Sequence, residues 1–190
     1  DVAQAGDGST GNRNYAEALQ KGDDNSAEVD QAGNGNLAYV DQQGGSSDND
    51  AAVDQDGNGN VADVFQRGSS LNEADVEQDG NVNEANVNQN GGATSGNSAT
   101  VGQDGRANIA TVEQQGSTGS TSDIAQDGAR NSAVTDQQRG TTDEANVAQS
   151  GTANTAFVAQ ANSADNDATI IQDGLRNDAQ ATQELSTDGS

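Results

Sequence analysis

The sequence predicts an all-β protein, a two-sided β-solenoid whose strand–arc–strand coils of about 23 residues stack end to end as cross-β amyloid. A nine-residue pattern, Asn-x-Ala-x-Val-x-Gln-x-Gly, recurs in sixteen arms along nearly the whole chain of 190 residues. Its fixed positions lie two residues apart, which is the side-chain period of a β-strand. From Asn25 onward the distances between arm starts alternate between 11 residues and 12 to 14 residues, so two arms make one coil.

Composition alone favours a different interpretation. Leu, Ile, Val and Phe number 25 of 190 residues, well under the share of about 20% that ordinary globular domains contain. The formal net charge is −24, which is typical of a disordered chain. Proline is absent, however, and disorder does not explain why all sixteen arms carry Gln at the same position. The arrangement of residues therefore outweighs their composition.

Several function classes are disfavoured by the residues that the chain lacks. It contains no His and no Cys, so imidazole catalysis, thiol chemistry and Cys/His zinc sites are excluded. No apolar run approaches the ~20 residues that cross a bilayer, and the acidic balance opposes nucleic-acid binding. The sequence therefore predicts no enzyme, no catalytic residues, no resident cofactor, no nucleic-acid partner and no membrane insertion.

The predicted coils follow one another in a regular order after an irregular start. A fragment, Val2 to Gly6, precedes the arm that begins at Asn14, and the phase of this first coil stays open. Each later coil holds an arm, an arc of four residues, a second arm and a looser arc of five to seven residues. Glycines supply the positive φ angles that such arcs need. We expect a single solenoid of eight repeats at residues 1–24, 25–48, 49–71, 72–96, 97–119, 120–142, 143–165 and 166–190.

The buried amides are the predicted structural ladders. Arms about 4.8 Å apart would place each amide above its twin, where side-chain N–H and C=O groups bond along the column. The predicted Gln ladder comprises Gln31, Gln42, Gln55, Gln66, Gln78, Gln89, Gln103, Gln114, Gln126, Gln137, Gln149, Gln160, Gln172 and Gln183. The predicted Asn ladder comprises Asn25, Asn36, Asn49, Asn60, Asn72, Asn83, Asn97, Asn108, Asn131, Asn154, Asn166 and Asn177.

The paired arms resemble a known repeat. The pattern N-x5-Q-x-G-x-x-N-x-A-x3-Q, clearest from Asn25 to Gln42, Asn49 to Gln66 and Asn72 to Gln89, is similar to the curlin repeat of the major curli subunit. The resemblance implies a structural subunit that self-assembles head to tail into extracellular amyloid fibres of a biofilm matrix, for adhesion and surface attachment. It also implies secretion through an outer-membrane pore and seeding by a nucleator subunit. The sequence starts at Asp1, so we expect a processed form.

A second interpretation stays open beside this one. A capped, monomeric and acidic β-solenoid would serve as an adhesin or as a calcium-binding surface protein. The two differ in whether the terminal strand edges accept another molecule.

The outward positions differ between the two predicted faces. The face of the first arms is strongly acidic, whereas the face of the second arms carries large apolar side chains and all four aromatic residues. We predict that the second face mediates lateral association, although scattered exposed apolar side chains are also ordinary in soluble proteins. The lateral contact candidates are Tyr15, Tyr39, Phe65 and Phe157.

A column of acids is the one candidate metal site. Asp56, Asp79, Asp104 and Asp127 occupy the same arc position in successive coils, and carboxylates with arc carbonyls are ligands that Ca²⁺ accepts. Solvated surface charge is the alternative interpretation. Arg106, Arg130 and Arg176 follow such acids and are expected to offset part of their repulsion.

One coil departs from the pattern. Asp143 stands where other arms have Asn, and Arg139 stands where other arms have Gly. We expect either that these two charges pair across their arc or that a one-residue slip returns Gly140 to the Gly position.

Overall fold

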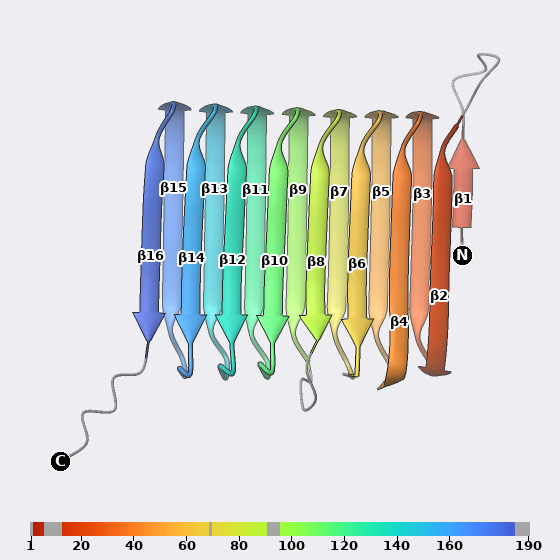
Figure 1. Ribbon diagram of the computed structural model, residues 1–190, viewed down its shortest axis with the longest axis horizontal. Helices are drawn as coiled ribbons and strands as arrows, with labels where there is room; N and C mark the ends of the chain where they lie inside the picture. Colours follow the sequence, from red (N-terminus) through yellow and green to blue (C-terminus); the bar gives the residue numbers. More distant parts are fainter. Residues whose placement is uncertain (1, 6–12, 69, 91–95, 185–190) are drawn as a thin grey trace.

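The computed structural model describes residues 2–5, 13–68, 70–90 and 96–184, and in these ranges the chain is all-β without a helix. Two parallel sheets of eight strands face each other as a two-sided β-solenoid (Figure 1). The predicted fold class is therefore confirmed. The odd-numbered sheet contains β1 (Val2–Ala5), β3 (Ser26–Asn34), β5 (Asp50–Asn58), β7 (Glu73–Asn81), β9 (Ser98–Arg106), β11 (Thr121–Ala129), β13 (Glu144–Thr152) and β15 (Asp167–Leu175). The even-numbered sheet contains β2 (Tyr15–Asp23), β4 (Leu37–Ser47), β6 (Val61–Arg67), β8 (Glu84–Asn90), β10 (Ile109–Gln115), β12 (Ser132–Gln138), β14 (Thr155–Ala161) and β16 (Asp178–Glu184).

Each strand pairs with the strands one coil away, and like residues stand opposite like residues. Gln55 lies opposite Gln78, and this register continues through the odd sheet. The first coil, whose phase the sequence left open, follows the same rule, because β1 pairs with β3 with Gln4 opposite Gln31. One irregularity follows Gln20, where the pairing of β2 with β4 shifts.

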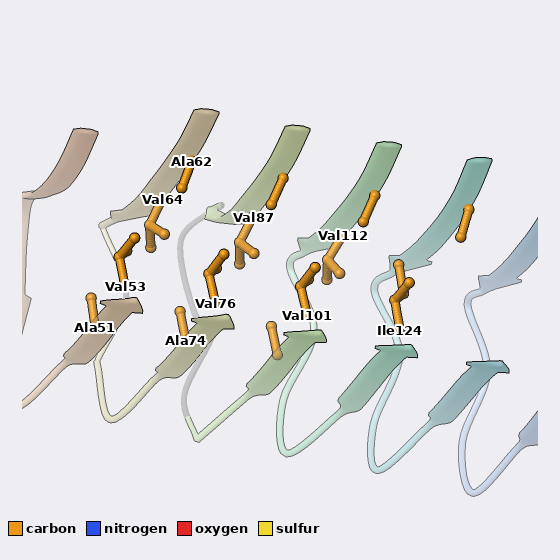
Figure 2. Close-up of a cluster of buried hydrophobic side chains, with 14 of the residues drawn as sticks. Ala51, Val53, Ala62, Val64, Ala74, Val76, Val87, Val101, Val112 and Ile124 are labelled. Carbon is orange, nitrogen blue, oxygen red and sulfur yellow. The ribbon is translucent and has the colours of Figure 1, made fainter. Parts of the chain in front are cut away.

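The core between the sheets is thin and consists almost entirely of Ala and Val. Figure 2 shows Val53 and Val76 of one sheet pointing toward Val64 and Val87 of the other. All four side chains are at most 2% exposed. Alternation along each strand sends the variable residues outward, as the two-residue period predicts.

The short arcs depend on glycine for a reason beyond chain reversal. Gly105 has a φ of 111°, and a Cβ added there would lie 2.1 Å from the carbonyl oxygen of Gly128 in the next coil. The same contact recurs between Gly57 and Gly80. These glycines therefore permit the close stacking of the coils as well as the turn itself.

A second positive-φ position directly precedes each ladder Asn, and the sequence pattern did not reveal it. Gly59 fills it before Asn60, but Val82 and Leu71 fill it elsewhere with φ angles of 60° and 59°. A β-branched residue in this conformation is strained. No described residue belongs to a helix that is long and apolar enough to cross a membrane.

Candidate assembly interface

The structure stacks the pattern glutamines into two continuous columns, one at each edge of the core. In the odd sheet, Gln55 Nε2 donates to Gln78 Oε1 at 2.8 Å, and Gln78 donates in turn to Gln103 at the same distance. In the even sheet, Gln137 donates to Gln160 at 2.9 Å. These side chains are almost fully buried, so the column bonds satisfy amides that would otherwise be costly to bury.

Each glutamine also forms a hydrogen bond between its own sheet and the facing sheet. Gln55 Nε2 gives its second hydrogen bond to the backbone carbonyl of Leu37, at 3.1 Å, and Gln137 bonds the carbonyl of Thr121 at 3.0 Å. The acceptors are the first residues of the facing strands. A shorter Asn would not reach both partners from this position, and a Glu would bring a charge without donors. This double role explains why the position is Gln in every arm.

The glutamine columns have a direction. Every column bond runs from the amide N–H of one coil to the amide oxygen of the following coil, from Gln31 through Gln149 to Gln172 in the odd sheet. At the C-terminal end the Nε2 of Gln172 and Gln183 each have a bond to the facing strand. Their remaining amide hydrogens face the side where a further coil would lie. The C-terminal end of the solenoid thus presents hydrogen-bond donors that point along the glutamine columns, toward the place of a further coil.

The asparagines behave differently from the predicted ladder. Asn60 Oδ1 accepts the backbone N–H of Asn83 at 3.0 Å, and its Nδ2 donates to the carbonyls of Asp56 and Gly80. A direct bond between two ladder asparagines occurs from Asn49 to Asn25 at 3.3 Å. The expectation of amide-to-amide asparagine stacking was therefore largely wrong. The short side chain lies against the arc, whose backbone groups need partners.

Asp143 replaces Asn in the same role, and both expectations for this coil were wrong. Its carboxylate accepts the hydroxyl of Ser163 at 2.8 Å and the backbone N–H of Asn166 at 3.1 Å. Arg139 is exposed and keeps the pattern Gly position with a φ of 54°, bonding Gln115 through its backbone. No slip occurs, because Gln137 and Gln138 stay in register with Gln160 and Ala161 of the next coil.

Two buried hydroxyls form a pair that the sequence pattern only marked as separate exceptions. Ser122 replaces Ala in one arm, and Thr135 replaces Val in the facing arm. Their oxygens lie 2.6 Å apart across the core, and both residues are fully buried. Each hydroxyl therefore satisfies the other. That both exceptions fall in one coil was the signal that could have predicted the pair.

The lateral candidates lie on the outer face of the even sheet. Tyr15 is 54% exposed, whereas Tyr39, Phe65 and Phe157 are half-buried. The rings of Tyr39 and Phe65 are 5.7 Å apart, and the Arg67 guanidinium lies 4.9 Å from the Phe65 centroid. The predicted lateral role of these residues stays a prediction.

Arg67 also forms an ion pair that the sequence analysis missed. Its guanidinium bonds the carboxylate of Asp41, which is 2% exposed although it belongs to the outward set of β4. This is the one ion pair within the described ranges. Arg106, Arg130 and Arg176 form no ion pair there, and their expected offset of the repulsion between the acids stays a prediction.

The acids of the odd sheet stand in register along its outer face. Asp56, Asp79, Asp104 and Asp127 are direct neighbours in successive strands. Burial, followed by repulsion from nearby carboxylates, raises the pKa of Asp54 beside this column. Within the described ranges no three acidic side chains converge as metal ligands do, and the predicted Ca²⁺ binding stays a prediction.

Comparison of the chain with protein-family models identifies its repeat. The family model described as the curlin associated repeat matches residues 11–44, 46–80, 71–105 and 140–174, which together exceed half of the chain. The chain belongs to the curlin-repeat family. This family is structural rather than enzymatic. No curated protein is similar enough to the chain to add a named relative.

Proposed function

We propose that this curlin-repeat chain is a structural subunit that adds head to tail to copies of itself and forms extracellular curli-like fibres. The observation that carries the proposal is the direction of the glutamine columns, because the donors of Gln172 and Gln183 suit the acceptor end of another copy. Such a contact joins two different ends, so it does not close on itself and propagates as a filament.

The terminal strands support the same proposal. In the described part of the chain, β15 and β16 each have a hydrogen-bonded neighbour on one side alone (Figure 1). β14 shows which groups such an edge offers, since Thr155 N–H donates to Asn177 O of the next coil at 2.7 Å. Asp178 stands opposite Thr155, and its N–H therefore points to the side where an incoming coil would pair. Asp167 takes the same position in β15, opposite Glu144.

Replacing the two edge aspartates by proline tests the proposal. Asp167→Pro with Asp178→Pro removes two outward N–H groups without removing a backbone hydrogen bond inside the solenoid. We expect fibre elongation, followed by sedimentation and electron microscopy, to slow about tenfold or more. Added in small amounts to the unaltered chain, the variant should also stop growing ends, because its own N-terminal end remains competent to add.

The control is Asp167→Asn with Asp178→Asn, which changes the net charge equally and keeps both N–H groups. It should elongate at least as fast as the unaltered chain. Equal elongation of the proline variant, with an unchanged circular dichroism spectrum, would reject edge pairing. Monodisperse particles of the unaltered chain at every salt concentration would instead favour a capped, monomeric solenoid.

Family membership supports the proposed location, role and partners of the fibres. We place the fibres outside the cell, in a biofilm matrix that serves adhesion and surface attachment, with a nucleator subunit and an outer-membrane secretion pore as partners. The resemblance to the major subunit in particular stays within the proposal, because the match identifies the repeat alone.

Lateral association is the second part of the assembly proposal. Tyr15, Phe65 and Phe157 expose ring surface on a sheet face that carries fewer acids than the opposite one. Replacing these three residues with Ser should leave fibre growth intact and reduce bundling in electron micrographs. Unchanged bundling would contradict a lateral role for this face.

A further inference from the structure

The outer face of the odd sheet contains a trough that runs along the stacking direction. Its floor is formed by the small residues Gly102, Ala125 and Ala148, which stand in one column in β9, β11 and β13. The column continues into Glu77 on one side and Ile171 on the other, so larger side chains close both ends. The trough has a volume of about 600 Å³. Its lining runs over four strand steps, roughly 19 Å, and its floor of small residues over two of them, roughly 10 Å.

One wall of the trough is a row of carboxylates. Asp79, Asp104 and Asp127 follow one another at the strand spacing of ~4.8 Å, and Asp173 continues the row after Ser150. The opposite side extends over a second depression lined by residues that include Asp123, Asn146 and Thr169. Burial, followed by the nearby Glu144, raises the pKa of Asp123. The trough therefore combines an apolar floor with a row of carboxylates that form no ion pair within the described ranges.

The shape and charge restrict what can occupy the trough. A second copy of this chain would bring a further formal charge of −24 against the carboxylate row. A single metal ion needs ligands around a point, whereas these carboxylates lie along a line and no three converge within the described ranges. The strand backbones of β9, β11 and β13 are already paired on both sides, so an added strand finds no backbone partners there.

We propose that this trough binds a linear aliphatic polyamine, whose methylene chain lies on Gly102, Ala125 and Ala148 and whose ammonium groups face Asp79, Asp104 and Asp127. The floor has no side chain beyond Cβ, which leaves room for an extended chain. Ammonium groups joined by three methylenes lie roughly one strand spacing of ~4.8 Å apart, so such a ligand contacts neighbouring carboxylates of the row at the same time. Binding also lowers the repulsion between stacked carboxylates.

Calorimetric titration of spermidine into the full chain at low salt tests the proposal. We expect saturable binding of one spermidine per chain, weakened by added salt. Asp104→Asn with Asp127→Asn should weaken the affinity roughly three- to tenfold. Ala125→Leu with Ala148→Leu should abolish binding although the charge is unchanged, because the leucines fill the floor.

Asp30→Asn with Asp50→Asn is the matched control, since it removes two acids of the same sheet outside the trough. It should leave the affinity within about twofold, as expected for distant screened charges. Equal weakening by this control pair, or unchanged binding after Ala125→Leu with Ala148→Leu, would show a diffuse counter-ion effect and overturn the proposal. The test uses soluble chains, so it is independent of fibre growth.

Discussion

A buried glutamine is unfavourable unless its amide finds partners, and the column glutamines find them on three sides. Gln103 accepts from Gln78, donates to Gln126 and bonds the carbonyl of Glu84. Its position thus joins neighbouring coils and facing sheets through one side chain. At the scale of the residue, this is why the repeat holds Gln constant while its outward neighbours vary.

Replacing Gln103 with Leu should therefore be strongly destabilising. The change leaves a Gln78 N–H and the Gln126 oxygen buried without a partner, so we expect the free energy of unfolding to fall by roughly 2–5 kcal/mol. Chemical denaturation followed by circular dichroism measures it. The control, Gln115→Leu, alters an exposed glutamine at the end of β10 and should change stability by less than about 0.5 kcal/mol. Equal effects would contradict the ladder.

The buried hydroxyl pair gives a prediction of coupling. Ser122→Ala alone leaves the Thr135 hydroxyl buried and unpaired, and Thr135→Val alone does the same to Ser122, each at about 1–3 kcal/mol. The double variant restores the ordinary Ala and Val of the other coils and should regain most of that loss. A double-mutant cycle by thermal or chemical unfolding checks it. Strictly additive losses would show that the two hydroxyls do not depend on each other.

At the scale of the element, the arcs and strands stack because glycine lets one coil approach the next. The carbonyl of each arc glycine occupies the place where a side chain of the preceding coil would stand. Asparagine side chains then complete the arc by bonding its backbone, as Asn83 does to Asp79 and Gly105. Strand pairing and arc geometry are thus parts of one repeating contact.

Two glycines of β9 differ in what their positions require, because Gly105 combines a positive φ with the stacking contact and Gly102 has neither. Gly105→Ala places a Cβ at 2.1 Å from the Gly128 oxygen in a positive-φ position, and we expect a loss of about 2 kcal/mol or more. Gly102→Ala meets no atom within 4 Å and should leave stability unchanged or raise it by up to about 1 kcal/mol. Thermal unfolding compares the two. A smaller loss for Gly105→Ala than for Gly102→Ala would contradict the stacking contact.

The sequence predicted the strands better than it predicted the arcs. Alternation of Ala, Val and Gln determines which side chains turn inward, so strand positions, pairing and core follow from it. The role of Asn60 and the partners of Asp143 depend on backbone groups of neighbouring coils, which no residue pattern displays. The trough was missed for a similar reason, since Gly102, Ala125 and Ala148 are unremarkable until register aligns them.

At the scale of the whole molecule, stacking places like charges together, and this makes stability depend on pH. Burial and neighbouring carboxylates raise the pKa of Asp54, Asp63 and Asp123 above the ordinary value of 3.8. An acid whose pKa is higher in the folded state than in the unfolded state destabilises the fold at pH values above that raised pKa. The destabilisation is relieved as the pH falls through the raised pKa toward 3.8.

We therefore expect the midpoint of denaturant unfolding to rise as the pH is lowered from neutral toward the raised pKa of these acids. Exchanging Asp54, Asp63 and Asp123 together for Asn should raise the midpoint at neutral pH and flatten this rise. The control is the variant with Asp50→Asn, Glu73→Asn and Asp167→Asn, which removes the same number of charges. Its unfolding midpoint is measured over the same pH range. A midpoint that falls steadily on acidification from neutral pH would contradict the assigned direction.

The central claim is that the amide columns and strand pairing inside one chain continue from chain to chain along a fibre. X-ray diffraction from aligned fibres tests it most directly, because the coils of the solenoid then repeat along the fibre axis. The account predicts a sharp meridional reflection near 4.8 Å from strands perpendicular to that axis. A reflection of this spacing on the equator, or fibres that lack it, would contradict end-to-end stacking.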